Sequence, residues 1–224
     1  PGKIPGDATA AQMEAVADLA DRFGHGEIRV SYQQNLVLPN VAVRDLGKVY
    51  DGLVTAGLAT ANTDLITDII ACPGLDYCNL ANARSIGIAQ EIAMRFSQAS
   101  RAEAVGPLRL NISGCINACG HHHAGNIGIL GVDKKGTEHY QISLGGSPKD
   151  DAEIGDILGP SFTAERVPDA IETIVETYLQ HRIDASETFV SAYRRLGKIP
   201  FRTALYGATP ASRGTAETEE TADV

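Results

Sequence analysis

The sequence predicts an α+β protein built in two parts. Near its start, segments with helical and strand periodicity follow each other in the order helix, strand, strand, helix, strand. In its centre, three strand-like segments run into glycine-rich turns, and a long amphipathic helix follows them. The chain has 224 residues, 43% of them hydrophobic, which suffices for one large domain or two small ones.

The first part resembles a known supersecondary unit with one strand removed. Thr9 to Gln12 has the form of a capping box, which predicts a helix that ends at Gly24. Four further elements are predicted in order: strands over 27–31 and 35–38, a helix over 46–54 and a strand over 66–71. This order is that of a ferredoxin-like βαββαβ unit without its first strand. We therefore expect the sequence to be the C-terminal part of a longer polypeptide.

The second part is predicted from apolar spacing and turn residues. The expected elements are a buried helix over 79–98, strands over 108–112, 126–132 and 139–144, a polar loop over 147–160, and helices over 167–179 and 186–196. Residues 201–207 are expected to pack back on the body. Residues 208–224 are rich in Ala, Thr and Glu without an apolar face, so we expect a disordered tail.

All the cysteines of the chain fall into two close pairs. The pairs are Cys72 with Cys78 and Cys115 with Cys119, and the second lies between Gly114 and Gly120. Four thiolates suit a tetrahedral zinc ion, an iron–sulfur cluster or, under oxidising conditions, two disulfides. The five-residue gap in the first pair is wide for a zinc knuckle, and glycines let backbone approach a bulky cluster. Spacing thus favours a cluster and leaves zinc and disulfides open.

Charge and hydropathy narrow the classes of partner. The formal net charge of -9 and the lack of basic clusters argue against nucleic acid as a partner. No apolar run reaches the length of a membrane span, and the start of the sequence lacks a signal-peptide pattern. These features predict a cytoplasmic protein that does not bind membranes, in a compartment that keeps thiols reduced.

The surroundings of the cysteines carry a resemblance to a known family. Gly114 to Gly120 reads Gly-Cys-Ile-Asn-Ala-Cys-Gly, follows a C-x5-C pair, and precedes Asn126 to Gly131 and the Gly145-Gly146 turn. This arrangement resembles the sirohaem and 4Fe-4S half of the nitrite and sulfite reductase family, over about residues 1–207. The resemblance implies a partial ferredoxin-like α/β sandwich over 1–66, a 4Fe-4S and sirohaem-binding domain over 67–207, and a tail over 208–224.

The same resemblance implies roles for individual residues. Cys72, Cys78, Cys115 and Cys119 would ligate the cluster, and Cys119 would also bridge it to the sirohaem iron. Asn117, Gln34 and Arg29 would contact the sirohaem, whose many carboxylates suit amide and guanidinium donors. Asn117 could equally be a turn residue, and polar residues beside strands often satisfy only local backbone. His121, His122 and His123 are expected to form hydrogen bonds near the cluster rather than to ligate metal.

The implied function is the six-electron reduction of sulfite to sulfide or of nitrite to ammonium. Electrons would come from ferredoxin or a flavoprotein, and the basic residues that bind the small anion would lie on a missing N-terminal half, covalent or a separate subunit. The isolated chain is therefore expected to be inactive. Two other functions are considered: an iron–sulfur electron-transfer module without sirohaem, and a structural zinc-binding module. The sequence does not distinguish sulfite from nitrite.

Overall fold

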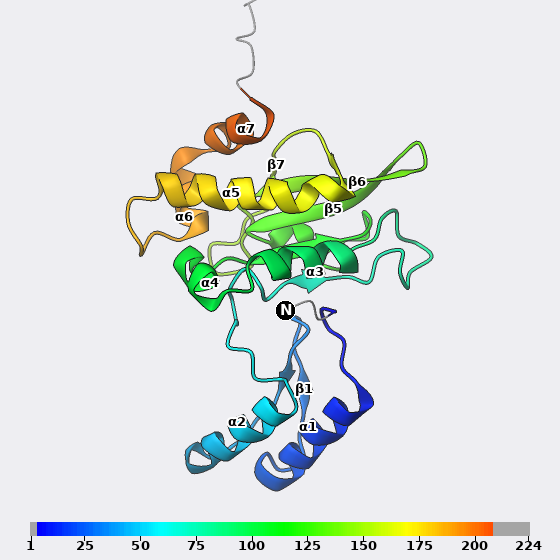
Figure 1. Ribbon diagram of the computed structural model, residues 1–224, viewed down its shortest axis with the longest axis vertical. Coiled ribbons are helices and arrows are strands. Elements are labelled where there is room, and N and C mark those ends of the chain that lie inside the picture. Colours follow the sequence, from blue (N-terminus) through cyan, green and yellow to red (C-terminus); the bar gives the residue numbers. More distant parts are fainter. Residues whose placement is uncertain (1–3, 208–224) are drawn as a thin grey trace, which may run out of the picture.

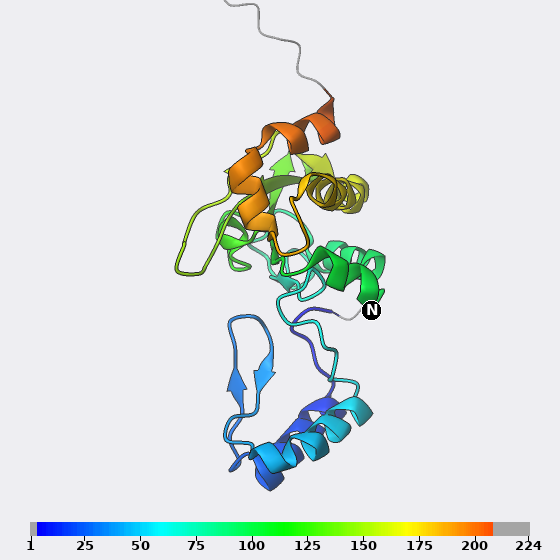
Figure 2. The ribbon, with the colours of Figure 1, turned by 90° about the vertical axis from the view of Figure 1, so that its left-hand side faces the viewer.

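The computed structural model describes residues 4–207, which form a smaller and a larger body joined by the segment 56–69 (Figure 1). The smaller body contains helices α1 (Ala10–Phe23) and α2 (Leu46–Thr55) and a two-stranded antiparallel hairpin, β1 (Arg29–Val30) and β2 (Leu36–Val37). Seen from the side, the hairpin extends from the two helices toward the larger body (Figure 2). The hairpin tip is therefore placed where it can contact the larger body.

Local sequence signals explain why α1 forms where it does. The Thr9 side chain accepts a hydrogen bond from the Gln12 backbone, and the Gln12 side chain accepts one from the Thr9 backbone, so the predicted capping box is confirmed. Val16, Leu19 and Ala20 are buried on one face of the helix, and α1 packs on α2. Both strands of the hairpin are shorter than predicted.

The larger body is a six-stranded mixed sheet. Its strands are β3 (Ile70–Ala71), β4 (Leu110–Ser113), β5 (Ile127–Lys134), β6 (Thr137–Leu144), β7 (Asp156–Ile157) and β8 (Phe162–Thr163). They lie in the order β3-β4-β5-β6-β7, and β8 also pairs with β6. The pairs β3–β4 and β4–β5 are parallel, whereas β5 and β6 form a long antiparallel hairpin. β3 is thus an edge strand held by β4 on one side.

Five helices complete the larger body: α3 (Ile86–Arg95), α4 (Ala99–Val105), α5 (Val167–His181), α6 (Phe189–Leu196) and α7 (Ile199–Tyr206). Helices α3 and α5 lie against one face of the sheet, and α7 packs on α5 (Figure 1). Between sheet and helices lies an aliphatic core that includes Ile92, Leu110, Ile112, Ile129 and Ile174. Within residues 4–207, no helix is long and apolar enough to cross a bilayer.

Two predictions of secondary structure were wrong. The strand predicted over 66–71 was assigned to the ferredoxin-like unit, but only Ile70–Ala71 is extended, and it pairs with β4 in the other sheet. The helix predicted over 79–98 begins only at Ile86, because the preceding backbone bonds to the loop after β4: Asn82 and Ala83 both donate to the Gly114 carbonyl. Helix α4 was not predicted. The mixed α and β class is confirmed, and the predicted tail over 208–224 lies outside the described residues.

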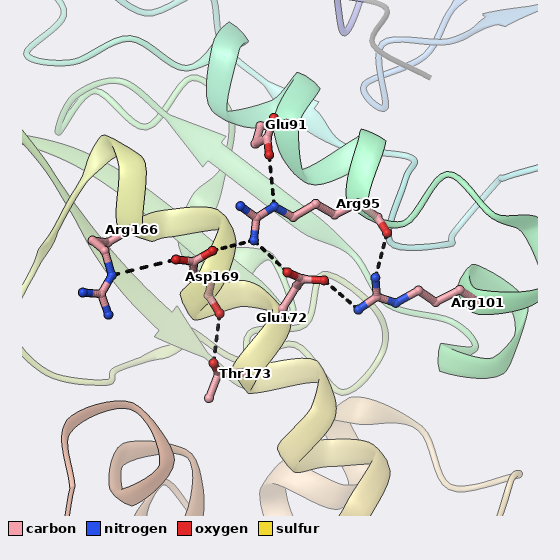
Figure 3. Close-up of polar contacts among 7 residues, drawn as sticks. All are labelled: Glu91, Arg95, Arg101, Arg166, Asp169, Glu172 and Thr173. Atoms are coloured by element: carbon pink, nitrogen blue, oxygen red, sulfur yellow. Dashed lines mark hydrogen bonds and ion pairs between the residues drawn. The ribbon is translucent and has the colours of Figure 1, made fainter.

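An ion-pair network fastens α3 to α5 beside the sheet (Figure 3). The Arg95 guanidinium donates to Glu91, Asp169 and Glu172 at 3.1, 2.6 and 2.7 Å. Glu172 also accepts from Arg101 of α4 at 2.7 Å. Burial raises the pKa of Glu172, but the hydrogen bonds from Arg101 and Arg95 outweigh burial, so the pKa lies below its ordinary value. The ionised Glu172 carboxylate thus joins three helices, and its protonation weakens these contacts.

We expect Glu172→Gln to lower the free energy of unfolding by about 1–2 kcal/mol at pH 7. Glu172 is partly buried, so the loss should lie between those for breaking an exposed and a buried salt bridge. A carboxyl whose folded pKa is lowered stabilises the fold above its unfolded pKa, near 4.5, and that contribution disappears as the pH falls through the folded value. The difference in unfolding free energy between variant and parent, measured by urea unfolding, should thus shrink below about pH 4.5.

Glu176→Gln, on an exposed part of the same helix, is the control and should change stability by less than about 0.5 kcal/mol. Equal effects of the two substitutions would contradict the role of the network.

Candidate functional site

The first cysteine of each pair follows one of two adjacent parallel strands. Cys72 comes directly after β3, and Cys115 comes two residues after β4. The Cys72 N–H donates to the Ile112 carbonyl at 3.1 Å, and the Gly114 N–H donates to the Cys72 Sγ at 3.0 Å. Because the carboxyl ends of parallel neighbours lie at the same sheet edge, the two cysteine loops begin side by side.

The two cysteine loops contact each other through glycines. A Cβ on Gly114 would lie 2.8 Å from the Gly74 Cα and 2.6 Å from the Ala83 carbonyl oxygen. Gly74 itself has a φ of +60°, and its carbonyl accepts the Cys78 N–H at 2.9 Å. Larger side chains at Gly74 or Gly114 would push the loops apart. Glycine at these two positions therefore keeps the two cysteine pairs together.

The C-x3-C loop folds back onto the strand that precedes it. Ser113 Oγ accepts the Gly120 N–H at 3.1 Å, and the Asn111 side-chain amide donates to the Gly120 carbonyl at 2.9 Å. A Cβ on Gly120 would lie only 1.9 Å from the Ile112 carbonyl oxygen, which leaves no room for a side chain. Between the cysteines, Ala118 takes a left-handed φ of +57°. The loop is thus fixed at both ends by β4.

The four thiols differ in their exposure to solvent. Cys72 and Cys115 are buried, Cys78 is half-buried and Cys119 is exposed. Apolar side chains of the same segments are exposed as well: Ile116, Tyr77 and Leu80 have relative exposures of 84%, 78% and 73%. An exposed thiol with exposed apolar side chains in the surrounding loops is the kind of surface that binds a further group or another protein segment.

The four cysteine thiols supply the donor chemistry that an iron–sulfur cluster needs. All four thiols are free, with no disulfide between them. A tetrahedral zinc site needs four sulfurs about 2.3 Å from one centre. Among residues 4–207, no three Cys, His, Asp or Glu side chains lie close enough to hold one ion. A cubane cluster spreads its ligands over a larger volume, and backbone N–H donors to cysteine sulfur, such as that of Gly114, are a means of tuning such clusters.

The sheet face beneath these loops is polar. Asn111, Gly128 and Ser143 lie in register across β4, β5 and β6, on the side opposite the apolar core. Within the described part of the chain, Asn111 Oδ1, Ser143 Oγ and His122 Nδ1 are buried without a hydrogen-bond partner. Burial lowers the pKa of His122, and neighbouring His123 lowers it further, so this position favours the neutral ring. Unsatisfied buried polar atoms indicate that this face is built to meet polar groups.

The sequence-predicted sirohaem contacts lie in three different surroundings. Asn117 is exposed between Cys115 and Cys119. Arg29 pairs with Glu27 at 2.6 Å on the surface of the hairpin. Gln34 bonds to the Ala71 backbone, directly before Cys72. The roles of all three toward sirohaem remain predictions.

Sequence reasoning missed the polar residues that shape the C-x3-C loop. Asn111 and Ser113 were not singled out, although both are buried and both bond to the Gly120 backbone. A signal existed, because strand alternation places them opposite the apolar Leu110 and Ile112. Polar residues at buried positions just before a cysteine loop could have been predicted to bond to it.

Comparison with protein-family models matches nearly the whole described chain. The nitrite/sulfite reductase ferredoxin-like half domain matches residues 2–56, and the nitrite and sulphite reductase 4Fe-4S domain matches residues 62–198. The chain belongs to the nitrite and sulphite reductase 4Fe-4S domain family. The region matched by the 4Fe-4S domain contains all four cysteines, and the predicted family resemblance is confirmed.

Individual relatives agree with the family assignment. The chain is 31% identical over 189 residues to sulfite reductase (ferredoxin) 2 of Mycolicibacterium paratuberculosis, which covers 80% of this chain and 34% of that protein. It is 30% identical over 185 residues to the chloroplastic ferredoxin–nitrite reductase of Zea mays, covering 77% of this chain and 32% of that protein. The chain thus spans about a third of the length of these curated relatives.

Solved structures share the fold. The Mycobacterium tuberculosis NirA protein superposes with a TM-score of 0.75 at 26% identity, covering 89% of this chain and 38% of that one. Dissimilatory sulfite reductase I also gives a TM-score of 0.75, at 14% identity, and covers 99% of this chain and 71% of that one, which supports the fold alone.

We expect Gly120→Ala to disrupt the C-x3-C loop, because its Cβ would collide with the rigid backbone of Ile112. The substitution should destabilise the fold by about 3 kcal/mol, and the protein should take up less than half the parent's iron after anaerobic reconstitution. The measurements are thermal unfolding and iron analysis.

Gly87→Ala is the matched control, because a Cβ at this helical position meets nothing within 4 Å. Helix propensity should make this variant more stable by about 0.5–1 kcal/mol, with unchanged iron uptake. Parent-like stability and iron content of Gly120→Ala would show that the tight loop is not required.

Proposed function

We propose that the chain is the cluster-bearing part of a sulfite or nitrite reductase, in which Cys72, Cys78, Cys115 and Cys119 hold a 4Fe-4S cluster beside a sirohaem. The observation that carries the proposal is the junction of the two cysteine loops at Gly74 and Gly114, which brings both pairs to one sheet edge. When bound, the two cofactors supply single electrons and an iron atom at which a small anion can be reduced by six electrons.

The buried and the exposed cysteines would have different roles. The buried Cys72, whose Sγ accepts the Gly114 N–H, would anchor the cluster away from solvent. The exposed Cys119 has the accessibility needed to share its sulfur with a sirohaem iron. Asn117, between the paired cysteines, is exposed on the same loop, where its amide could donate to a sirohaem carboxylate.

A further segment of protein would complete the substrate site. Sulfite and nitrite are anions that need cationic side chains around them, whereas this chain has a net charge of -9. The relatives are about three times as long as the matched region. These facts support a missing N-terminal half, covalent or a separate subunit, that supplies the basic residues.

The electron donor would be a ferredoxin or a flavoprotein. Two relatives carry ferredoxin in their names, which favours ferredoxin. Four free thiols in one chain fit a reducing compartment, so we infer that the protein works in the cytoplasm.

The test is the metal and cofactor content of protein purified without oxygen. We expect about five iron, four from the cluster and one from the sirohaem, and about four sulfide per chain, together with a Soret absorption band from sirohaem. One zinc and no iron would indicate the structural zinc module instead. A cluster without a Soret band would indicate an electron-transfer module. Sulfide and ammonium formation, measured with the complete enzyme and reduced ferredoxin, distinguishes sulfite from nitrite as substrate.

In the complete enzyme, we expect Cys119→Ser to lower turnover by about a hundredfold or more and to alter the haem absorption, because the shared sulfur is lost. Cys119 is exposed, so the fold should survive, which circular dichroism can check. Ser97→Ala, at an exposed position beyond α3, serves as the surface control. Full activity and an unchanged haem spectrum in Cys119→Ser would refute the bridging role.

A further inference from the structure

The tip of the β1–β2 hairpin contacts the strand that leads to the first cysteine. This hairpin tip, residues 31–35, is closed by a hydrogen bond from the Ser31 N–H to the Asn35 carbonyl at 2.9 Å. Within it, Gln34 has a left-handed φ of +61°, unusual for a residue with a side chain. The Gln34 side chain is half-buried, and its amide contacts the larger body.

The Gln34 carboxamide pairs with both backbone groups of Ala71. Its Nε2 donates to the Ala71 carbonyl at 2.8 Å, and its Oε1 accepts the Ala71 N–H at 3.0 Å. This is the pattern by which a neighbouring strand would pair with one residue. β3 is an edge strand of two residues, with β4 on its other side, so Gln34 takes the place of a strand neighbour.

The pairing lies one residue from a cluster ligand. Ala71 is 3% exposed and Cys72 is 8% exposed, so in the intact protein the two backbone groups of Ala71 bond to Gln34 rather than to water. The Cys72 N–H bonds to β4, and Cys72 Sγ accepts the Gly114 N–H. The end of β3 is thus held from two sides: by β4 at Cys72 and by Gln34 at Ala71.

Other contacts of the hairpin tip end farther from the cysteine. Gln33 Nε2 donates to Asp64 at 3.3 Å, and Asn35 Nδ2 donates to Asp68 at 3.2 Å. Tyr32 Oη accepts from Arg109 at 3.0 Å. These contacts fasten the hairpin to the linker and to the residue before β4, but none of them pairs with β3.

We propose that Gln34 is a positioning residue for Cys72: its carboxamide completes the pairing of β3 and so fixes the Cys72 sulfur where the cluster needs it. The role in cluster binding rests on the proposed function, whereas the role in holding β3 does not. The two hydrogen bonds leave one hydrogen of Nε2 and one lone pair of Oε1, so a sirohaem contact by the same side chain remains compatible.

The test compares Gln34→Ala with Gln33→Ala in the full chain, prepared free of metal. In Gln34→Ala, hydrogen exchange of the Ala71 amide should accelerate about tenfold or more, because its acceptor is gone. Alkylation of Cys72 should accelerate by a similar factor relative to Cys115. Gln33→Ala removes a similar side chain from the same hairpin tip and should leave both rates within about twofold of the parent.

Gln34→Glu provides a second variant in case the alanine variant folds poorly. It keeps an oxygen to accept the Ala71 N–H but loses the donor to the Ala71 carbonyl, so its exchange rate should lie between those of the parent and Gln34→Ala. After reconstitution with iron and sulfide, Gln34→Ala should lose iron to a chelator about tenfold faster than Gln33→Ala.

Each outcome separates the two claims. Parent-like exchange at Ala71 in Gln34→Ala would overturn the pairing of Gln34 with β3. Faster exchange at Ala71 with parent-like alkylation of Cys72 and parent-like iron loss would overturn the positioning of Cys72. If no protein, including the parent, took up iron, the proposed function would fail, while the exchange and alkylation rates would still decide the role of Gln34.

Discussion

The parallel pairing of β3 with β4 is the constraint on which the cysteine site depends. It places the backbone of Cys72 against that of Ile112 and brings the Gly114 N–H within 3.0 Å of the Cys72 Sγ. Cys72 and Cys115 are 43 residues apart in the sequence, and no local signal could bring them together. The glycines at positions 74 and 114 then allow the loops beyond the strands to touch. The helices α3 and α5, joined by the Arg95 network, pack on one face of the sheet and bury its apolar side chains.

Local patterns predicted the elements whose stabilisation is local. The capping box at Thr9 and the apolar stripe of α5, with Pro168 in its first turn, were confirmed because they depend on neighbouring residues. The four cysteines and the glycines beside the second pair predicted the correct family for a similar reason: cysteine spacing and tight turns are visible in the sequence. Chemistry carried by residue type was therefore easier to predict than the packing around it.

Predictions failed where distant backbone decided the structure. The helix predicted over 79–98 included residues 79–85, yet the N–H groups of Asn82 and Ala83 bond to the Gly114 carbonyl instead of continuing a helix. The strand before Cys72 has the composition of any short strand, and only its partner shows that it belongs to the larger sheet. The family resemblance implied that Gln34 contacts a sirohaem, and that contact stays a prediction. The Gln34 amide bonds to Ala71 because the hairpin tip meets the larger body there, and no local sequence pattern reveals that contact.

The exposed apolar side chains point to surfaces that another protein segment would cover. On the hairpin, Val30, Tyr32 and Val37 are 79%, 62% and 44% exposed, and on the cysteine loops Ile116 is 84% exposed. The hairpin tip and the Cys72 loop are linked directly by the Gln34 pairing with Ala71. If the proposed N-terminal half covered both surfaces, it would also exclude water from this pairing. Hydrogen bonds gain strength as water is excluded, so covering these surfaces would tighten the hold on Cys72. The assembly of the complete enzyme and the geometry of its cluster ligands would then be coupled through one glutamine side chain.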